Sequence, residues 1–211
     1  VGAGRTEFAR ALIGYDPPID GEEFINGEKA VVKNIRQMQR KYKLYYLSEN
    51  RKEEGLFLDH SIKVNISSSI LNKIKNRLGM LNFKKEKEVA NKFKEKLDIK
   101  TPSINQMVNN LSGGNQQKVS IAKGLSVEPD ILIIDEPTVG IDIKTKAEIH
   151  RLMHNLTKEG KSIICITSDM QEIIQIADRI VVFKAGKIKG ELKNTKVYGE
   201  MSKRIMKLIM D

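Results

Sequence analysis

Two adjacent carboxylates, Asp135 and Glu136, follow directly after the apolar run ILII (131–134). Four consecutive apolar residues are typical of a parallel strand that is covered on both faces. Charges at the end of such a strand are costly to bury unless a partner compensates them. A magnesium ion bound to phosphates is such a partner: Asp135 would hold the metal, and Glu136 would orient or deprotonate an attacking water. The alternative is a strand that ends in a solvated acidic turn.

A second pattern, LSGGNQQK (111–118), precedes the carboxylates in the chain. Glycines expose backbone N–H groups, and the start of a helix carries partial positive charge. Ser112, Gly113 and Gly114 therefore predict an anion site with a hydroxyl as an added donor. The alternative is an ordinary serine N-cap followed by flexible glycines. The polar run 115–118 and the acidic strand that follows favour the anion site.

A third pattern opens the chain as VGAGRTE. A phosphate-binding loop ends in Gly-Lys-Ser or Gly-Lys-Thr, and here Gly4-Arg5-Thr6 stands in its place. Successive backbone N–H groups would still form an anion nest. Arg5 places a planar fork where a compact ammonium normally reaches between phosphates. The Glu7 carboxylate, at about 5 Å from a phosphate, would repel it by roughly 3 kcal/mol at an effective dielectric near 20. We expect weaker or altered nucleotide binding.

LSGGNQQK followed by ILIIDEPTVGID resembles the signature and Walker B motifs of the ATP-binding subunits of ABC transporters. GAGRTE, SENRKEEGL and the ending NQQK are similar to the second cassette of double-cassette sugar importers of the ribose, galactose and xylose type. The resemblance covers nearly the whole chain. It implies an α/β P-loop NTPase fold with a mostly parallel sheet and an inserted helical subdomain, and it implies ATP and Mg²⁺ as cofactors.

The resemblance also implies a role for each matching residue. Glu136 would be catalytic, Thr6 and Asp135 would hold Mg²⁺, and Asp142 would contact a partner cassette. Glu49 replaces the usual glutamine of the Q-loop, and Ser168 replaces the histidine that most members carry. The nucleotide-binding residues would be Gly2, Ala3, Gly4, Arg5, Thr6, Glu49 and Ser168, and the signature would comprise Leu111, Ser112, Gly113, Gly114 and Asn115.

In this family two cassettes close face to face, and each ATP lies between the Walker motifs of one and the signature of the other. We therefore expect a degenerate Walker side here and an intact signature that serves the partner cassette, with little ATP turnover by this chain alone. The resemblance implies further partners: transmembrane permease subunits and, indirectly, a periplasmic or lipid-anchored solute-binding protein. It places the chain at the cytoplasmic face of a bacterial membrane.

The overall charge leaves other hypotheses open. A formal net charge of +10 over 211 residues allows an ABC-type ATPase that acts on nucleic acid, although scattered lysines are usually solvated faces. A nucleoside or other solute could replace the sugar, and a regulatory domain without turnover is a third possibility. Cys165 is the only cysteine, which favours a reducing compartment. No apolar run is long enough to predict a membrane span.

The remaining pattern predicts the elements that position these motifs. The pattern predicts buried strands at 44–47, 131–134 and 162–167. It predicts helices around 8–13, 149–156, 173–177 and 201–209. Strands that alternate with helices favour a parallel sheet with helical crossovers. Hairpins should turn at Asn26-Gly27 and Ala185-Gly186. We expect a partial cassette over 1–211 whose N-terminal strands are missing, a helical subdomain over 58–112 and a C-terminal helix over 194–211.

Overall fold

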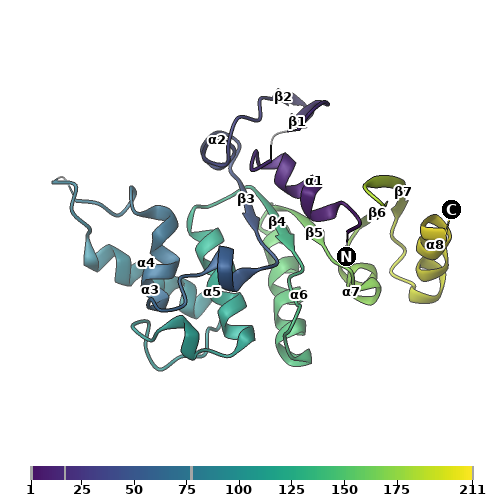
Figure 1. Cartoon of the computed structure of the whole chain (residues 1–211). Coiled ribbons are helices and arrows are strands. Elements are labelled where there is room, and N and C mark those ends of the chain that lie inside the picture. The colour runs from purple at the N-terminus through teal and green to yellow at the C-terminus, as the bar shows by residue number, and fades with distance from the viewer. Residues whose placement is uncertain (1, 17, 77, 211) are drawn as a thin grey trace. The chain divides into compact units, whose positions relative to one another are not determined.

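The computed structural model of the protein describes residues 2–16, 18–76 and 78–210. The chain divides into two compact units, one formed by Val1–Tyr42 with Ile164–Asp211 and the other by Lys43–Ile163. We call them unit 1 and unit 2. Both mix helices and strands, as Figure 1 shows, and each is considered by itself below.

Unit 2 is built on two parallel strands. β3 (Leu44–Leu47) pairs with β4 (Ile131–Asp135), with Leu44 opposite Ile131. Leu132, Ile133 and Ile134 are completely buried, as the continuous apolar run predicted. β5 (Ser162–Ile166) starts beside β4, where the Ser162 N–H donates to the Asp130 carbonyl at 2.9 Å. The expected α/β class with a parallel sheet is confirmed.

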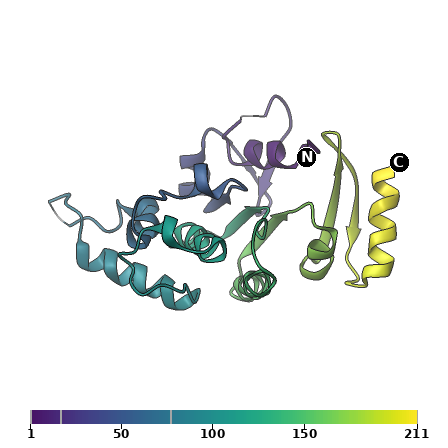
Figure 2. The same ribbon diagram turned by 60° about the horizontal axis from the view of Figure 1, so that its bottom comes forward.

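The helices of unit 2 lie together, as the blue and teal ribbons of Figure 2 show. α3 packs against both α4 and α5, and the turn η1 packs against α5. A different serine side chain caps each of α3 and α5, and an asparagine side chain caps α4. The bounds are η1 (Arg51–Gly55), α3 (Ile62–Ser67), η2 (Ser68–Ile70), α4 (Phe83–Lys96), η3 (Val108–Asn110), α5 (Gly113–Ser126) and α6 (Ile143–Lys158).

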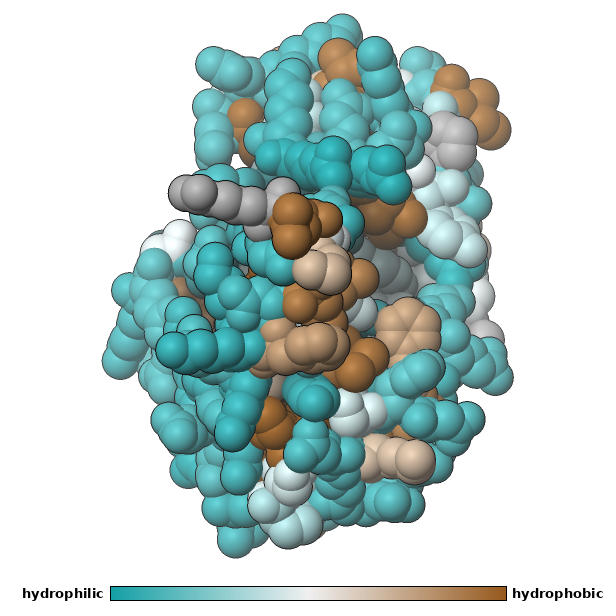
Figure 3. Space-filling model, turned by 90° about the vertical axis from the view of Figure 1, so that its left-hand side faces the viewer, coloured by the Kyte–Doolittle hydropathy of each residue, from teal (hydrophilic) through white to brown (hydrophobic). Residues whose placement is uncertain are grey.

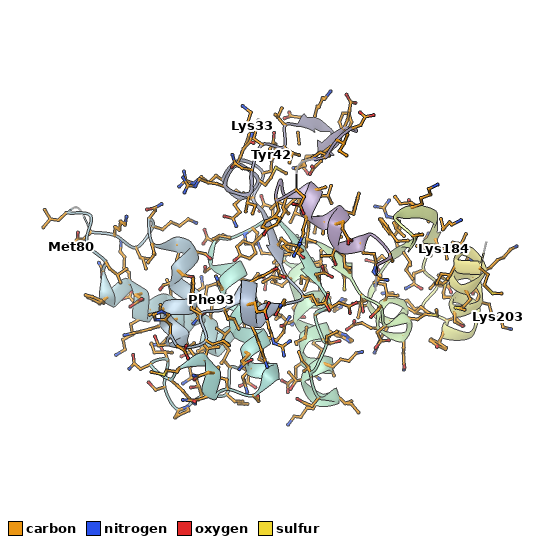
Figure 4. All side chains as sticks on the ribbon, viewed as in Figure 1. Lys33, Tyr42, Met80, Phe93, Lys184 and Lys203 are labelled. Carbon is orange, nitrogen blue, oxygen red and sulfur yellow. The ribbon has the colours of Figure 1, made fainter. Side chains whose placement is uncertain are left out.

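One face of α4 supplies core to this helical group. Phe93, labelled in Figure 4, and Leu97 are buried, and their spacing of four residues places them on one side of the helix. Glu86 lies on the same face and is also buried, because its Oε1 accepts a hydrogen bond from the Ser67 hydroxyl of α3 at 2.9 Å. The hydrophobic pattern did not reveal this polar pair.

Unit 1 contains both predicted hairpins. The turn residues Asn26 and Gly27 have φ of 54° and 82°, and Ala185 and Gly186 have 49° and 75°. Positive φ at both central residues is the geometry that tight hairpins need. The bounds are α1 (Arg5–Leu12), β1 (Glu23–Ile25), β2 (Glu28–Ala30), α2 (Ile35–Lys41), α7 (Met170–Ile176), β6 (Arg179–Lys184), β7 (Lys187–Lys193) and α8 (Tyr198–Met210).

An apolar cluster holds the C-terminal part of unit 1 together. Side chains from α7, β6 and α8 form it. In the same unit the ring of Phe8 from α1 lies 5.4 Å from that of Phe183 from β6. Helical spacing predicted the two inward residues of α8, Met201 and Ile205. The buried members are Ile174, Ile180, Val182, Met201 and Ile205.

The structure corrects two expectations about these elements. In β5 only Ile166 is buried and Ile164 is 41% exposed, because an apolar run does not reveal which faces its neighbours cover. The C-terminal helix begins at Tyr198 rather than at residue 194. The Asn194 amide donates to the carbonyls of Ile174 and Ala177, and its Oδ1 accepts from the Lys196 N–H, which fixes a turn ahead of the helix.

The segment 71–83 of unit 2 presents apolar surface. Leu71, Leu78, Met80 and Phe83 are exposed, and Figure 3 shows brown apolar surface on this side of the molecule. None of the helices in the described ranges combines the length and apolar character that a membrane crossing requires.

The centre of unit 2 should be sensitive to truncation. We predict that Ile133→Ala lowers the free energy of unfolding by about 2–5 kcal/mol, because the residue is fully buried and leaves a cavity. Ile143→Ala is the matched control: Ile143 is 89% exposed, and its truncation should cost less than about 0.5 kcal/mol. Urea unfolding of both variants measures the difference, and equal losses would contradict the assigned core.

Candidate functional site

The carboxylates after β4 are buried and held in a defined geometry. Asp135 is 1% exposed, and its Oδ2 accepts a hydrogen bond from the Tyr46 hydroxyl of β3 at 3.0 Å. Glu136 is 8% exposed and has φ of +46°, a left-handed conformation that is uncommon for glutamate. Such backbone strain is frequent at functional sites. The strand therefore does not end in a solvated acidic turn. Tyr46 lies in the predicted strand 44–47 and belongs to none of the motifs.

The predicted anion site is the start of α5. Ser112 is exposed and caps the helix, because its Oγ accepts from the N–H and the side-chain amide of Asn115, at 3.4 and 3.0 Å. The serine cap considered as an alternative is thus real. It leaves the Gly113 and Gly114 N–H groups without a hydrogen bond to any residue that the structure describes. Capping and anion binding are compatible here, because they use different groups.

The rest of the NQQK ending anchors this helix start. Gln116 is buried, and its Nε2 donates to the carbonyls of Val108 and Leu111, which fixes the segment before the serine. Lys118 is also buried and pairs with Glu148 of α6 at 2.8 Å. The hydrogen bond from Lys118 holds the pKa of Glu148 below its ordinary value. These buried contacts hold the start of α5 in place.

A steric constraint joins the start of α5 to the start of α6. A Cβ on Gly114 would lie 2.5 Å from Cγ2 of Thr145, closer than real atoms approach. Thr145 cannot turn aside, because Asp142 accepts hydrogen bonds from its N–H at 3.0 Å and from its hydroxyl at 2.8 Å. These bonds, from the backbone first, hold the pKa of Asp142 below its ordinary value. Asp142 remains exposed, and its role as a dimer contact stays a prediction.

The opening glycines form a bare helix start in unit 1. Gly4 has φ of 89° and is the N-cap of α1, which no side chain caps. The Ala3 carbonyl accepts from the Gly186 N–H at 3.0 Å, and a Cβ on Gly4 would lie 2.7 Å from Cα of Gly186. Only glycine fits this position. The loop thus rests on the β6–β7 turn, a contact that the sequence did not reveal.

The side chains after these glycines differ in exposure. Arg5 and Thr6 are half-buried, whereas Glu7 points into solvent. A solvated carboxylate acts through water, so its repulsion of a phosphate at about 5 Å falls to roughly 1 kcal/mol, below the sequence-based value.

The last two nucleotide-binding candidates lie on exposed loops. Glu49 follows β3, and its carbonyl accepts from the Arg51 N–H at 3.0 Å. Ser168 lies on the turn before α7, between Thr167 and the helix cap Asp169, whose Oδ1 accepts from the Glu172 N–H. Unit 1 therefore holds the glycine loop with Ser168. Unit 2 holds Glu49, the acidic pair, Asp142 and the signature, and Thr6 and Asp135 belong to different units.

The contact between Gly114 and Thr145 predicts a selective loss of stability. Gly114→Ala should destabilise the protein by about 1–3 kcal/mol, because the new methyl overpacks a stiff and hydrogen-bonded side chain. Gly199→Ala is the control: residue 199 is also helical and nothing lies within 4 Å of its Cβ position, so alanine should be neutral or stabilising. Thermal unfolding measures both, and a neutral Gly114→Ala would show that this packing is loose.

The chain is similar in sequence to known proteins. Residues 1–139 match the family described as ABC transporter. The chain is 44% identical over 192 residues to the ribose import ATP-binding protein RbsA of Bacillus subtilis. The matched stretch covers 91% of this chain and 38% of that protein. The chain is 42% identical over 207 residues to the corresponding protein of Clostridium tetani, covering 98% and 40%. The chain thus spans about two-fifths of the length of these curated relatives.

The fold is shared with solved structures as well. A dimeric ATP-binding cassette in a post-hydrolysis state with ADP and Pi superposes with a TM-score of 0.75 at 25% identity, over 90% of this chain and 81% of that one. A nucleotide-free cassette from an ABC transporter gives 0.80 at 17% identity, over 98% and 83%. The family match extends over more than half of the chain, and the chain belongs to the ABC transporter family.

Proposed function

We propose that this chain is an ATP-binding cassette of a sugar importer and that its signature completes the ATP site of a partner cassette. The observation that carries the proposal is the start of α5, where a capping serine is exposed and the N–H groups of Gly113 and Gly114 donate to none of the described residues. The import names of the relatives support the sugar. The chain matches only part of those proteins, so transport itself is part of the proposal.

At the signature this chain would contribute binding groups and no reacting atom. The Ser112 hydroxyl and the Gly113 N–H would donate hydrogen bonds to the terminal phosphate of a nucleotide held by the partner cassette. The helix α5 has 14 residues, so its first turn carries the partial positive charge of a helix N-terminus. These donors are fixed before the nucleotide arrives, which favours stabilisation of the charge that develops during phosphoryl transfer.

On its own Walker side the chain keeps some of the expected groups. The loop of Gly2, Ala3 and Gly4 would cradle phosphates, and the carboxylate of Asp135 and the hydroxyl of Thr6 are hard oxygen donors that suit Mg²⁺. A bound magnesium ion would neutralise phosphate charge there. The burial of Asp135 and its hydrogen bond from Tyr46 support the assignment, because they fix one carboxylate oxygen.

On the same side Glu136 would hold the attacking water and accept its proton. This side also departs from the family at four positions, which would weaken its turnover. Glu49 would bring a carboxylate where an amide is usual, and Ser168 has shorter reach than a histidine and no cationic form. The four departures are Arg5, Glu7, Glu49 and Ser168.

The proposal includes partners outside this chain. A second cassette would supply the competent Walker motifs, and the greater length of the relatives suggests that it precedes this one in the same polypeptide. Transmembrane permease subunits would convert cassette movement into transport at the cytoplasmic face of the membrane, and a solute-binding protein would act indirectly. A nucleoside or another solute is the alternative cargo. We propose no nucleic-acid partner.

Two substitutions at Ser112 test the signature role without disturbing the fold. Aspartate and asparagine both cap helices as well as serine does, so both variants should keep the thermal stability. Ser112→Asp places a negative charge against the phosphate and should lower ATP turnover of the complete transporter at least about 100-fold, which corresponds to about 2.7 kcal/mol. Ser112→Asn carries no charge and should retain more than about a tenth of the activity. Equal turnover by the two variants would contradict the proposal.

The degenerate Walker side predicts that the isolated chain hydrolyses ATP negligibly. Glu7→Gln should tighten its Mg-ATP binding by several-fold, because a negative charge that repels the phosphates through solvent is removed. Glu28→Gln, an equally exposed change on β2 of the same unit, is the control and should have no effect. Calorimetry and a phosphate-release assay measure both properties. Robust magnesium-dependent turnover by the isolated chain would overturn the assignment of a weakened site.

A further inference from the structure

A guanidinium group lies beside the signature; it belongs to Arg51 in the stretch SENRKEEGL, and the sequence pattern assigns it no role. Nη1 of Arg51 donates to the Val139 carbonyl in the loop after β4, at 3.1 Å and across 88 residues of sequence. Nη2 lies 3.2 Å from the point that a Cβ on Gly113 would occupy, and 4.0 Å from the corresponding point on Gly140. Arg51 therefore sits between the first turn of α5 and the loop that leads to α6.

This placement concentrates positive charge. The N-terminus of a helix repels cations, and a half-buried arginine normally finds a carboxylate partner. Within the described ranges Arg51 forms no ion pair, and its Nε is buried without an acceptor. The acidic neighbours are engaged elsewhere, because Glu53 accepts from the side-chain amide of Asn50 at 2.6 Å and Glu54 accepts from the Ser48 hydroxyl. The excess of positive charge suits an anion.

The guanidinium is also held in place. Arg51 opens η1, a π-helical turn, a rare element that is frequent at functional sites. The far end of η1 is fixed to α5, because Lys123 donates to the Gly55 carbonyl at 2.8 Å and lies over the Phe57 ring. Burial lowers the pKa of Arg51, but an arginine stays charged in proteins. One nitrogen is anchored, and Nη2 forms no hydrogen bond with the described residues.

We propose that Arg51 is a further ligand of the phosphate that the signature receives: Nη2 would donate a charge-assisted hydrogen bond to the terminal phosphate of the partner's nucleotide. This inference rests on the proposed function, because it assigns a third donor to the same site. Ser112 and Gly113 supply neutral donors there, and Arg51 supplies the only full positive charge found next to them among the described contacts. The loop after β3 thereby senses the nucleotide of the partner cassette.

The test compares Arg51→Gln with Arg51→Lys and with Lys52→Gln in the complete transporter. A charge-assisted hydrogen bond predicts that Arg51→Gln raises the KM for ATP about 10- to 100-fold. Arg51→Lys keeps the charge, so its KM should lie between those of the parent and the glutamine variant. Lys52 is an exposed neighbour, and Lys52→Gln makes the same change of net charge at a position with no described contact to Gly113 or Gly140. It should leave the KM unchanged.

The other outcomes separate this inference from the function beneath it. If Arg51→Gln and Arg51→Lys lower kcat equally and leave KM unchanged, Arg51 only positions the Val139 loop and the proposal is wrong. If Arg51→Gln behaves like Lys52→Gln, it is wrong as well. In both cases a loss of turnover by Ser112→Asp shows that the signature role stands. If Ser112→Asp is silent, the proposed function fails and the Arg51 proposal fails with it. Thermal unfolding of each variant confirms that folding is intact.

Discussion

The methyl group of Thr145 occupies the space that any side chain at residue 114 would need, and the architecture of unit 2 depends on this exclusion. It keeps the backbone at the start of α5 free of side chains, and it brings the first turns of α5 and α6 into contact. Asp142 makes the constraint rigid through two hydrogen bonds to the same threonine. The chemistry of the signature thus begins with a packing contact between two helix starts.

The parallel pairing of β3 and β4 explains why so many polar residues meet nearby. The carboxyl ends of parallel strands lie at the same edge of a sheet, so the loops after both strands project from one side. One loop carries Glu49 and Arg51, and the other begins with the acidic pair and leads to Asp142. Two hydrogen bonds cross this edge. Arg51 donates to the Val139 carbonyl and joins the two loops, and Tyr46 donates to Asp135 and joins the two strands.

Local patterns predicted much of this protein. The buried run 131–134 gave β4, the Asn-Gly and Ala-Gly pairs gave both hairpins, and the serine and glycines of the signature gave the start of α5. Each of these signals lies within a few consecutive residues, where spacing, turn chemistry and capping act directly.

The contacts that the sequence did not reveal join residues far apart in the chain. Tyr46 and Asp135 are 89 positions apart, and Arg51 and Val139 are 88 apart. No local pattern encodes such pairs, because they form only once two loops have been brought together by the strands. The roles of Thr145 and Glu86 were not predicted for a related reason. A threonine in a helix, or a glutamate in a lysine-rich helix, has the pattern of an ordinary solvated residue until the packing is known.

The described contacts that shape the signature fall within Lys43–Ile163. They involve Val108, Glu148 and Arg51. The glycine loop belongs to a different stretch of chain and draws its own shape from the β6–β7 turn. Each stretch therefore takes its local shape from its own set of contacts. Under the proposed function, a substitution in the glycine loop would act on this chain's own nucleotide site, whereas one at the start of α5 would act on the partner's.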